Sequence, residues 1–221
     1  GPGRTGKGLD AFSSLRRVRV YHDLTHRVDP SRRSMGHMQL SSVTQSEIRV
    51  TLELAFQLAN RATDDTLDIR QTLLDDGFSR AATASSASIH RVGRRLAQLT
   101  PLLRELHAMT TLDAAARINE ELTELPIAPA IVEHDGVPAH IHWTPNTATF
   151  DDQVITDIVI ALAQEVCEHG TARFGRCDAE GCDDLFYDAT RNRSRRFCDD
   201  PRCASRTHTA DHRARRKAGA P

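Results

Sequence analysis

The chain has 221 residues with 29 Lys or Arg and 30 Asp or Glu, so its net charge of −1 favours neither an anionic nor a cationic partner. Its 39% hydrophobic and 27% charged residues are ordinary for a globular protein, and the absence of a long apolar run excludes a membrane-spanning protein. The charge is unevenly distributed along the chain. Residues 40–170 carry nineteen acidic and nine basic side chains, whereas residues 171–221 carry eight acidic and twelve basic side chains. We therefore expect a cytoplasmic protein with an acidic middle and a basic carboxyl end.

Residues 1–39 form the first segment, with eight basic and three acidic side chains. The opening Gly-Pro-Gly resembles the remnant of a cleaved tag, and Met35 or Met38 is a natural start within the segment. We expect a basic, flexible arm here, in which residues 15–21 form at most a short strand.

Apolar residues at three- and four-residue steps predict helices through most of residues 40–122. One helix starts with Ser46 as its cap, and a second covers roughly residues 86–99. Pro101 then begins a further turn or short helix, since proline is favoured at the first helical position. Asp113 is the expected cap of a third helix that runs toward Leu122.

Residues 128–143 change to short β-prone runs, Ala130–Val132 and Ala139–Trp143, joined around Asp135-Gly136. This dipeptide between two such runs predicts a β-hairpin. His140 and His142 alternate with Ile141 and therefore share one face of the second strand. Together with His134 they form either a metal or ligand site or a row of solvent-facing histidines.

Asp151 and Asp152 precede a long apolar-periodic segment that ends at Gly170 and predicts a helix over residues 151–170. This helix is expected in the core or in a homodimer interface. Cys167 lies in its last turn, where we expect a buried thiol that packs as a small hydrophobe.

The last fifth of the chain contains the most specific motif, four cysteines spaced C-x4-C-x15-C-x4-C: Cys177, Cys182, Cys198 and Cys203. Zinc accepts four thiolates in a tetrahedron, and short loops bring each pair onto one ion. Disulfides would need an oxidising compartment and would leave Cys167 unpaired. The spacing therefore predicts a structural Zn²⁺ site.

The same segment resembles the CGNR zinc finger family over about residues 173–217. The resemblance rests on the paired cysteines, the aromatic-Asp pair Tyr187-Asp188, the run Arg191-Asn192-Arg193-Ser194-Arg195-Arg196-Phe197-Cys198, and the closing Cys203-Ala204-Ser205-Arg206. The family closes with Cys-Gly-Asn-Arg, so this chain keeps the ligand and the arginine but has lost the glycine and the asparagine. The resemblance implies an amino-terminal ABATE domain over residues 40–170 and a role as a stress-induced transcription regulator.

Within residues 171–221 we expect a small treble-clef-like or zinc-ribbon-like module. Leu185–Tyr187 and Arg196-Phe197 are its expected hairpin strands, with aromatic side chains covering the metal because so small a module has little other core. A basic helix should follow over residues 206–217. His208 and His212 lie one turn apart on it and would be alternative ligands in a mixed site.

Basic and polar residues surround the second cysteine pair and suit contacts with several phosphates of double-stranded DNA. The expected DNA-binding residues are Arg191, Asn192, Arg193, Arg195, Arg196, Arg206, Arg213, Arg215, Arg216 and Lys217. Among them Asn192 and Arg206 are the expected base readers. The alternative is a solvated surface on a zinc-stabilised interaction or ligand-sensing adaptor.

Taken together, the sequence predicts an α+β protein with a mostly helical domain at residues 40–170, carrying a small hairpin, and a zinc module at residues 171–221. We expect a DNA-binding transcription regulator whose helical domain dimerises or binds a small-molecule effector. No catalytic motif is present, and four thiolates would leave zinc no open position for a substrate. We therefore do not expect an enzyme.

Overall fold

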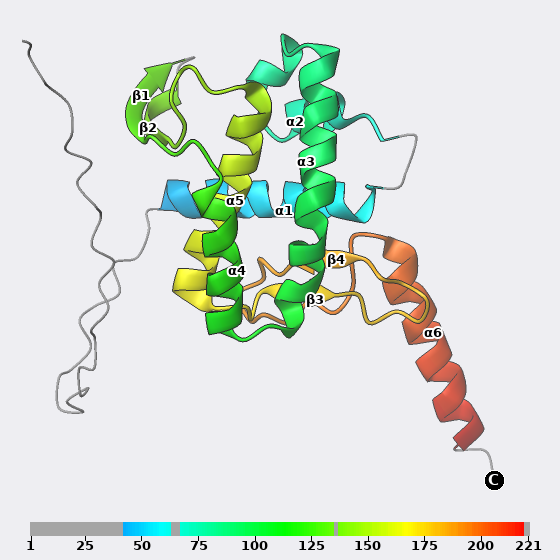
Figure 1. Ribbon diagram of the computed structural model, residues 1–221. Helices are drawn as coiled ribbons and strands as arrows, with labels where there is room; N and C mark the ends of the chain where they lie inside the picture. The colour runs from blue at the N-terminus through cyan, green and yellow to red at the C-terminus, as the bar shows by residue number, and fades with distance from the viewer. Residues whose placement is uncertain (1–41, 63–66, 135–136, 219–221) are drawn as a thin grey trace, which may run out of the picture. The chain divides into compact units, whose positions relative to one another are not determined.

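The computed structural model describes residues 42–62, 67–134 and 137–218, so the predicted arm at residues 1–39 and the turn Asp135-Gly136 lie outside the described residues. Figure 1 shows helices joined to two small antiparallel hairpins, which confirms the predicted α+β class. The elements are α1 (Ser42–Asn60), α2 (Ile69–Asp75), α3 (Ser86–Glu105), α4 (Thr111–Thr123), β1 (Ala130–His134), β2 (Val137–His142), α5 (Phe150–His169), β3 (Phe174–Arg176), β4 (Leu185–Tyr187) and α6 (Pro201–Ala218). None of the described helices has a stretch apolar enough to span a bilayer.

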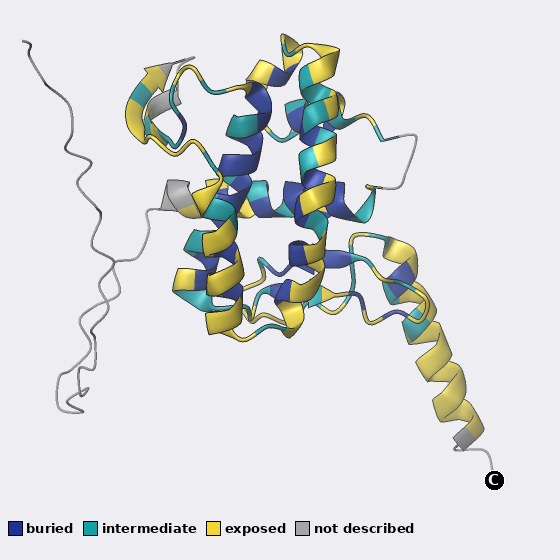
Figure 2. Ribbon diagram, in the orientation of Figure 1, coloured by how far each residue is buried: buried dark blue, intermediate teal, exposed yellow. Residues whose placement is uncertain are grey.

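Helix α5 is the centre of the core. It packs against α1, α3 and α4, and it buries residues on most of its circumference, shown in dark blue in Figure 2. A helix that is apolar on nearly all sides belongs inside a protein. The alternative that this helix forms a dimer interface is therefore not needed to explain its apolar sequence.

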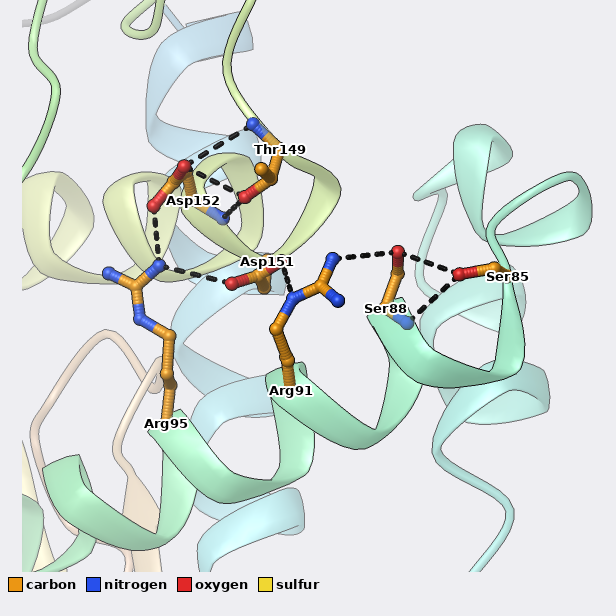
Figure 3. Close-up of polar contacts among 7 residues, drawn as sticks. All are labelled: Ser85, Ser88, Arg91, Arg95, Thr149, Asp151 and Asp152. Atoms are coloured by element: carbon orange, nitrogen blue, oxygen red, sulfur yellow. Dashed lines mark hydrogen bonds and ion pairs between the residues drawn. The ribbon is translucent and has the colours of Figure 1, made fainter.

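The amino end of α5 carries a capping box and an ion-pair network (Figure 3). Thr149 is the N-cap, and its hydroxyl accepts a hydrogen bond from the amide of Asp152, whose carboxylate accepts one from the amide of Thr149. Asp151 and Asp152 therefore lie in the first turn, inside the helix. From α3, Arg91 Nε lies 2.9 Å from Asp151, and Arg95 Nη1 lies 2.6 Å from Asp152. Carboxylates at a helix amino end are favourable, and these two also fasten α5 to α3.

Burial would raise the pKa of both of these carboxyl groups, but the hydrogen bonds from Thr149 and the neighbouring arginines hold the pKa of Asp151 and of Asp152 below the usual range. Both groups are therefore charged near neutral pH, as their pairing with Arg91 and Arg95 requires. Since the two carboxylates balance the two guanidinium groups, we interpret this cluster as a structural contact that links α3 to α5.

Three predicted helix boundaries are wrong. Helix α1 begins before Ser46, which lies inside it, and α4 is capped by Thr110, with Asp113 as the third helical residue. Helix α3 runs through Pro101 without a break to Glu105. A proline costs an internal helix one hydrogen bond and some crowding, and the burial of Leu99, Leu102 and Leu103 on both sides of it compensates here.

The hairpin β1–β2 forms as predicted, with Ile131 opposite Ile141 and Val132 opposite His140. The two isoleucines lie on its outer face and are exposed by 79% and 49%. The buried position predicted for Cys167 on α5 is wrong, because this residue faces solvent.

The second hairpin pairs β4 with β3, and the predicted pairing of Leu185–Tyr187 with Arg196-Phe197 is wrong. Phe174, Leu185 and Tyr187 join the main core with the helices, whereas the cysteines form a second, smaller cluster with Phe197. The sequence predicts that Phe186 or Tyr187, together with Phe197, covers the metal site; Phe197 does pack against the cysteines, whereas Tyr187 packs into the main core. The hairpin is anchored in the helical core, and the cysteine loops are attached to it.

Candidate metal centre and the arginine-rich surface beside it

The first cysteine pair is placed by the β3–β4 hairpin. Cys177 directly follows β3, and its amide donates to the carbonyl of Asp184 at 2.8 Å. The amide of Cys182 donates back to the carbonyl of Ala179 at 3.1 Å, which closes a tight loop between the two cysteines. Gly181 has a φ of 73°, a left-handed conformation that favours glycine, and so permits this loop.

The second pair is placed by the start of α6. Cys198 precedes the helix, and Cys203 lies in its first turn, where its amide donates to the carbonyl of Asp200 at 3.0 Å. The two pairs are tied together by the amide of Asp178, which donates to the carbonyl of Arg196 at 2.9 Å. Backbone hydrogen bonds thus hold both cysteine loops face to face.

The four Sγ atoms converge, and all of them lie within 4.8 Å of one another. Cys198 Sγ is 3.8 Å from Cys182 Sγ and 3.7 Å from Cys203 Sγ. Four sulfurs at about 2.3 Å from a tetrahedral zinc ion would lie about 3.8 Å apart, whereas disulfide sulfurs lie about 2.05 Å apart. The spacing therefore fits one tetrahedral metal ion and does not fit disulfides.

The four thiols would not all ionise together without a bound cation. Hydrogen bonds from the amides of Cys198 and Ala179 outweigh burial and lower the pKa of Cys177. Burial and the neighbouring thiols raise the pKa of Cys182 to about 11 and raise that of Cys198 further. Four thiolates so close together repel one another, so a bound divalent cation is what allows all four to be ligands.

Residues 173–216 match the family model of the CGNR zinc finger. The match contains all four cysteines, and a zinc finger family together with a four-thiol cluster supports zinc as the metal. It does not extend into the helices before Arg173, so the expected ABATE domain stays a prediction. A search of curated proteins found no match for the chain.

Contacts around the four cysteines also stabilise the cluster. Arg206 Nη2 donates to Cys203 Sγ at 3.5 Å, and Phe197 packs against the cluster. His208 contacts the edge of the Phe197 ring at 5.8 Å between centroids, and among the described residues neither His208 nor His212 joins the cluster. The four cysteines are thus the group that suits a metal ion, and a positive charge lies next to one of the sulfurs.

The loop that displays the predicted DNA contacts is built around Asp188, which is 4% exposed. Its carboxylate accepts hydrogen bonds from the hydroxyl of Thr190 at 2.6 Å and from the amides of Thr190 and Arg195 at 2.8 Å each. The guanidinium of Arg173 donates to the carbonyls of Asp188 and Thr190 from the other side. The loop therefore has a fixed base, and its tip, residues 191–194, is exposed.

Burial would raise the pKa of Asp188, but the hydrogen bonds from Thr190 and Arg195 and the charge of Arg173 hold the pKa below its usual range. A lowered folded-state pKa stabilises the fold fully above the unfolded value of about 3.9, and this contribution disappears as the pH falls through the folded value. We expect Asp188→Asn to destabilise the protein at pH 7 by about 2 kcal/mol, because an amide replaces an ionised acceptor. The difference from the unmutated protein should shrink below about pH 4.

Chemical unfolding at pH 7, 5 and 3 measures this difference. Loss of zinc at low pH affects both proteins, so only the difference between them reports on the carboxylate. As a control, Asp211→Asn removes an exposed carboxylate from α6 and should change little at any pH. A constant difference from pH 7 to pH 3 would contradict the role assigned to the ionised Asp188.

Arg195 packs within the fold and does not face solvent like the arginines at the tip of the loop, and its sequence motif does not indicate this difference. Its guanidinium lies 4.8 Å from the centre of the Phe186 ring and donates to the carbonyl of Phe197 and to Asp199. The Phe186 ring in turn covers Gly175, where an added Cβ would meet ring atoms at 2.4 Å. The stack of Gly175, Phe186 and Arg195 joins the hairpin to the second cysteine loop.

The ten predicted DNA contacts therefore fall into two sets. Three of them have partners within the described residues: Arg195 as above, Arg206 on Cys203, and Arg196 on Asp178 at 2.8 Å. The side chains of the other seven are exposed and make no hydrogen bond or ion pair within the described part of the chain: Arg191, Asn192, Arg193, Arg213, Arg215, Arg216 and Lys217. No sequence pattern indicates this division, because it depends on which side chains and carbonyl groups the fold brings near each residue.

Proposed function

We propose that the protein is a zinc-dependent transcription regulator that binds double-stranded DNA through the CGNR zinc finger segment. The observation that carries the proposal is the set of exposed cations on the loop at residues 191–193 and on α6 whose side chains have no partner among the residues that the structure describes. Six such cations in a segment whose neighbouring arginines are paired are what a phosphate-binding surface requires. They stand on a rigid base, since Asp188 and the cysteine cluster hold the loop and the start of α6.

Helix α6 offers a face for this contact. Arg206, Arg213 and Lys217 recur at seven- and four-residue steps, and Arg216 precedes Lys217, so these cations share one side of the helix. Beyond its first turn α6 is exposed along nearly its whole length, shown in yellow in Figure 2. A helix that is polar on all sides gains little from packing, and a bound polyanion would stabilise it.

The helical residues 42–170 would then supply regulation, through dimerisation or a small-molecule effector. An enzymatic role is not part of the proposal, because four thiolate ligands complete the tetrahedral shell of zinc and leave no position for a reacting group. The competing function is an adaptor that uses the zinc module for a protein partner.

The experiment is a titration of the full chain with a fluorescent duplex from its own upstream region at two salt concentrations. Each phosphate contact contributes about 0.9 to the slope of log affinity against log salt. The double variant Arg213→Ala, Arg216→Ala should weaken binding to all duplexes and lower this slope by up to about 2. The matched control is Arg94→Ala, which removes an exposed cation from α3. Equal binding by the double variant and the control, or no DNA binding by the zinc-loaded chain, would favour the adaptor.

A further inference from the structure

The hairpin β1–β2 holds two histidines that the proposed function does not use. His140 and His142 are on β2, alternate with Ile141, and are both partly buried. Their cross-strand neighbours are Val132 and Ala130, respectively. Both histidine side chains thus lie on the same face of the hairpin, next to small or aliphatic side chains.

The two imidazole rings converge through the same atom. Nε2 of His140 lies 3.1 Å from Nε2 of His142, and the rings meet edge to face with centroids 5.0 Å apart. Two imidazole nitrogens about 2.0–2.1 Å from one metal ion, at an angle of roughly 90–109°, would lie about 2.9–3.4 Å apart. The observed separation falls inside this range, so a cation can be bound between them without moving the backbone.

A hydrogen bond between one protonated and one unprotonated Nε2 also fits 3.1 Å, and it is the state that we expect for the hairpin without metal. The two states can interconvert, because the proton on the donating Nε2 can move to Nδ1 of the same ring, which frees both Nε2 atoms for a cation. The contact between the two rings already places both Nε2 atoms on the same side of the strand at this separation. Prearranged ligands lose little conformational freedom when a metal binds.

We propose that His140 and His142 form a second metal site, separate from the four-cysteine cluster, which binds a divalent transition-metal ion through both Nε2 atoms. Imidazole ligands suit Cu²⁺, Ni²⁺ and Zn²⁺, and the general order of affinities places Cu²⁺ first. Two protein ligands leave the remaining coordination positions to water, so the ion exchanges readily. An isolated two-stranded hairpin is only marginally stable. An ion bound by two side chains of β2 would restrict the conformation of this strand.

The test uses the full chain with its cysteine cluster already loaded with one zinc ion, titrated calorimetrically with Ni²⁺. We expect one further ion per chain. Loss of a group that hydrogen-bonds to a metal ligand lowers the metal affinity about 10–100-fold. Loss of a ligand itself, in His140→Ala or His142→Ala, should therefore lower the affinity for Ni²⁺ by at least as much. The control is His212→Ala, which removes one of the two histidines, His208 and His212, that lie one turn apart on α6. This variant should bind Ni²⁺ like the unmutated chain.

A measurement on the unmutated chain keeps the test independent of the folding of the variants. Paramagnetic Ni²⁺ should selectively broaden the NMR signals of the His140 and His142 rings. The proposal is overturned if the zinc-loaded chain binds no Ni²⁺, or if the affinity falls in His212→Ala but not in the hairpin variants. It is also overturned if nickel binds only by releasing zinc from the cysteines. Because DNA plays no part in these measurements, the result is separate from the proposed function.

Discussion

Cys198→Ser should release zinc and abolish specific DNA binding together. In the unmutated chain we expect one zinc per protein after dialysis against a moderate chelator, and in the variant close to none. DNA affinity should fall at least about tenfold, which corresponds to about 1.4 kcal/mol. The expected cause is structural, because the binding free energy of a structural zinc ion is largely the folding free energy of its loops.

The structure defines which part of the chain depends on the metal. Besides the thiols, the cysteine cluster contains little apolar material, chiefly Ala179 and Phe197, whereas β3 and β4 pack into the helical core. Loss of zinc should therefore release the cysteine loops and the start of α6 and leave the hairpin and the helices folded. Far-UV circular dichroism should show most of the helical signal retained, while proteolysis cuts the chain within the released cysteine loops.

The matched control for this prediction is Cys167→Ser. Cys167 is exposed and lies outside the cluster, so its loss should change neither the zinc content nor the DNA affinity. A Cys198→Ser protein that keeps its zinc through dialysis would contradict the four-cysteine site. A variant that loses zinc but binds DNA with unchanged affinity and salt dependence would separate the metal from the proposed function.

Glu165→Ala should destabilise the whole protein more than any other single change proposed for the helical core. Glu165 lies on α5, is 3% exposed, and accepts a hydrogen bond from the Tyr187 hydroxyl at 2.9 Å. His169 Nδ1 lies 3.0 Å and Arg173 Nε 3.6 Å from its other oxygen. Removing one partner of such a buried pair costs about 3–5 kcal/mol, because it leaves the other charge uncompensated.

The same cluster links the core to the proposed DNA-binding loop. Burial and the charge of Glu165 raise the pKa of Tyr187, so its hydroxyl stays protonated and can donate. Arg173 is held by Glu165 on one side and donates to the carbonyls of Asp188 and Thr190 on the other. We therefore expect Glu165→Ala to loosen the loop as well as to lower the free energy of unfolding.

The measurement is urea unfolding of Glu165→Ala beside Glu165→Gln and Glu168→Ala. The glutamine can still accept from Tyr187 but lacks the charge that faces Arg173, so its cost should be intermediate. Glu168 is a more exposed neighbour on the same helix, with only long contacts to His169 and Gln45. Its removal should cost less than about 0.5 kcal/mol. Equal stability of Glu165→Ala and Glu168→Ala would show that the buried cluster contributes little.

Features with strong local signals could be predicted from the sequence. The cysteine spacing predicted the converging Sγ atoms, the apolar periodicity predicted α5, and the Asp-Gly between β-prone runs predicted the β1–β2 hairpin. Each of these patterns is contained within about thirty residues. In each case the local chemistry and the tertiary structure favour the same outcome.

Features that depend on distant contacts could not be predicted. The strand Phe174–Arg176 has only three residues with a central glycine, and it is a strand because it pairs with β4, where the Phe186 ring covers that glycine. The continuation of α3 through Pro101 depends on burial of the leucines around it, which overrides the local preference. The structural position of Arg195 depends on Phe186 and Asp199, and nothing in the run of arginines distinguishes it from its exposed neighbours.

The anchoring of the β3–β4 hairpin limits how modular the zinc finger segment can be. Residues 173–216 match a family model as a unit, yet Phe174, Leu185 and Tyr187 are part of the helical core. A fragment cut at residue 171 would expose all three to water and lose the partner of Tyr187, so zinc alone would not make it a stable, transferable domain. Because these contacts join the helical core directly to the β3–β4 hairpin, a change in the packing of α5 would also move the cysteine loops. Under the proposed function, effector binding and DNA binding would then take place in one cooperatively folded unit.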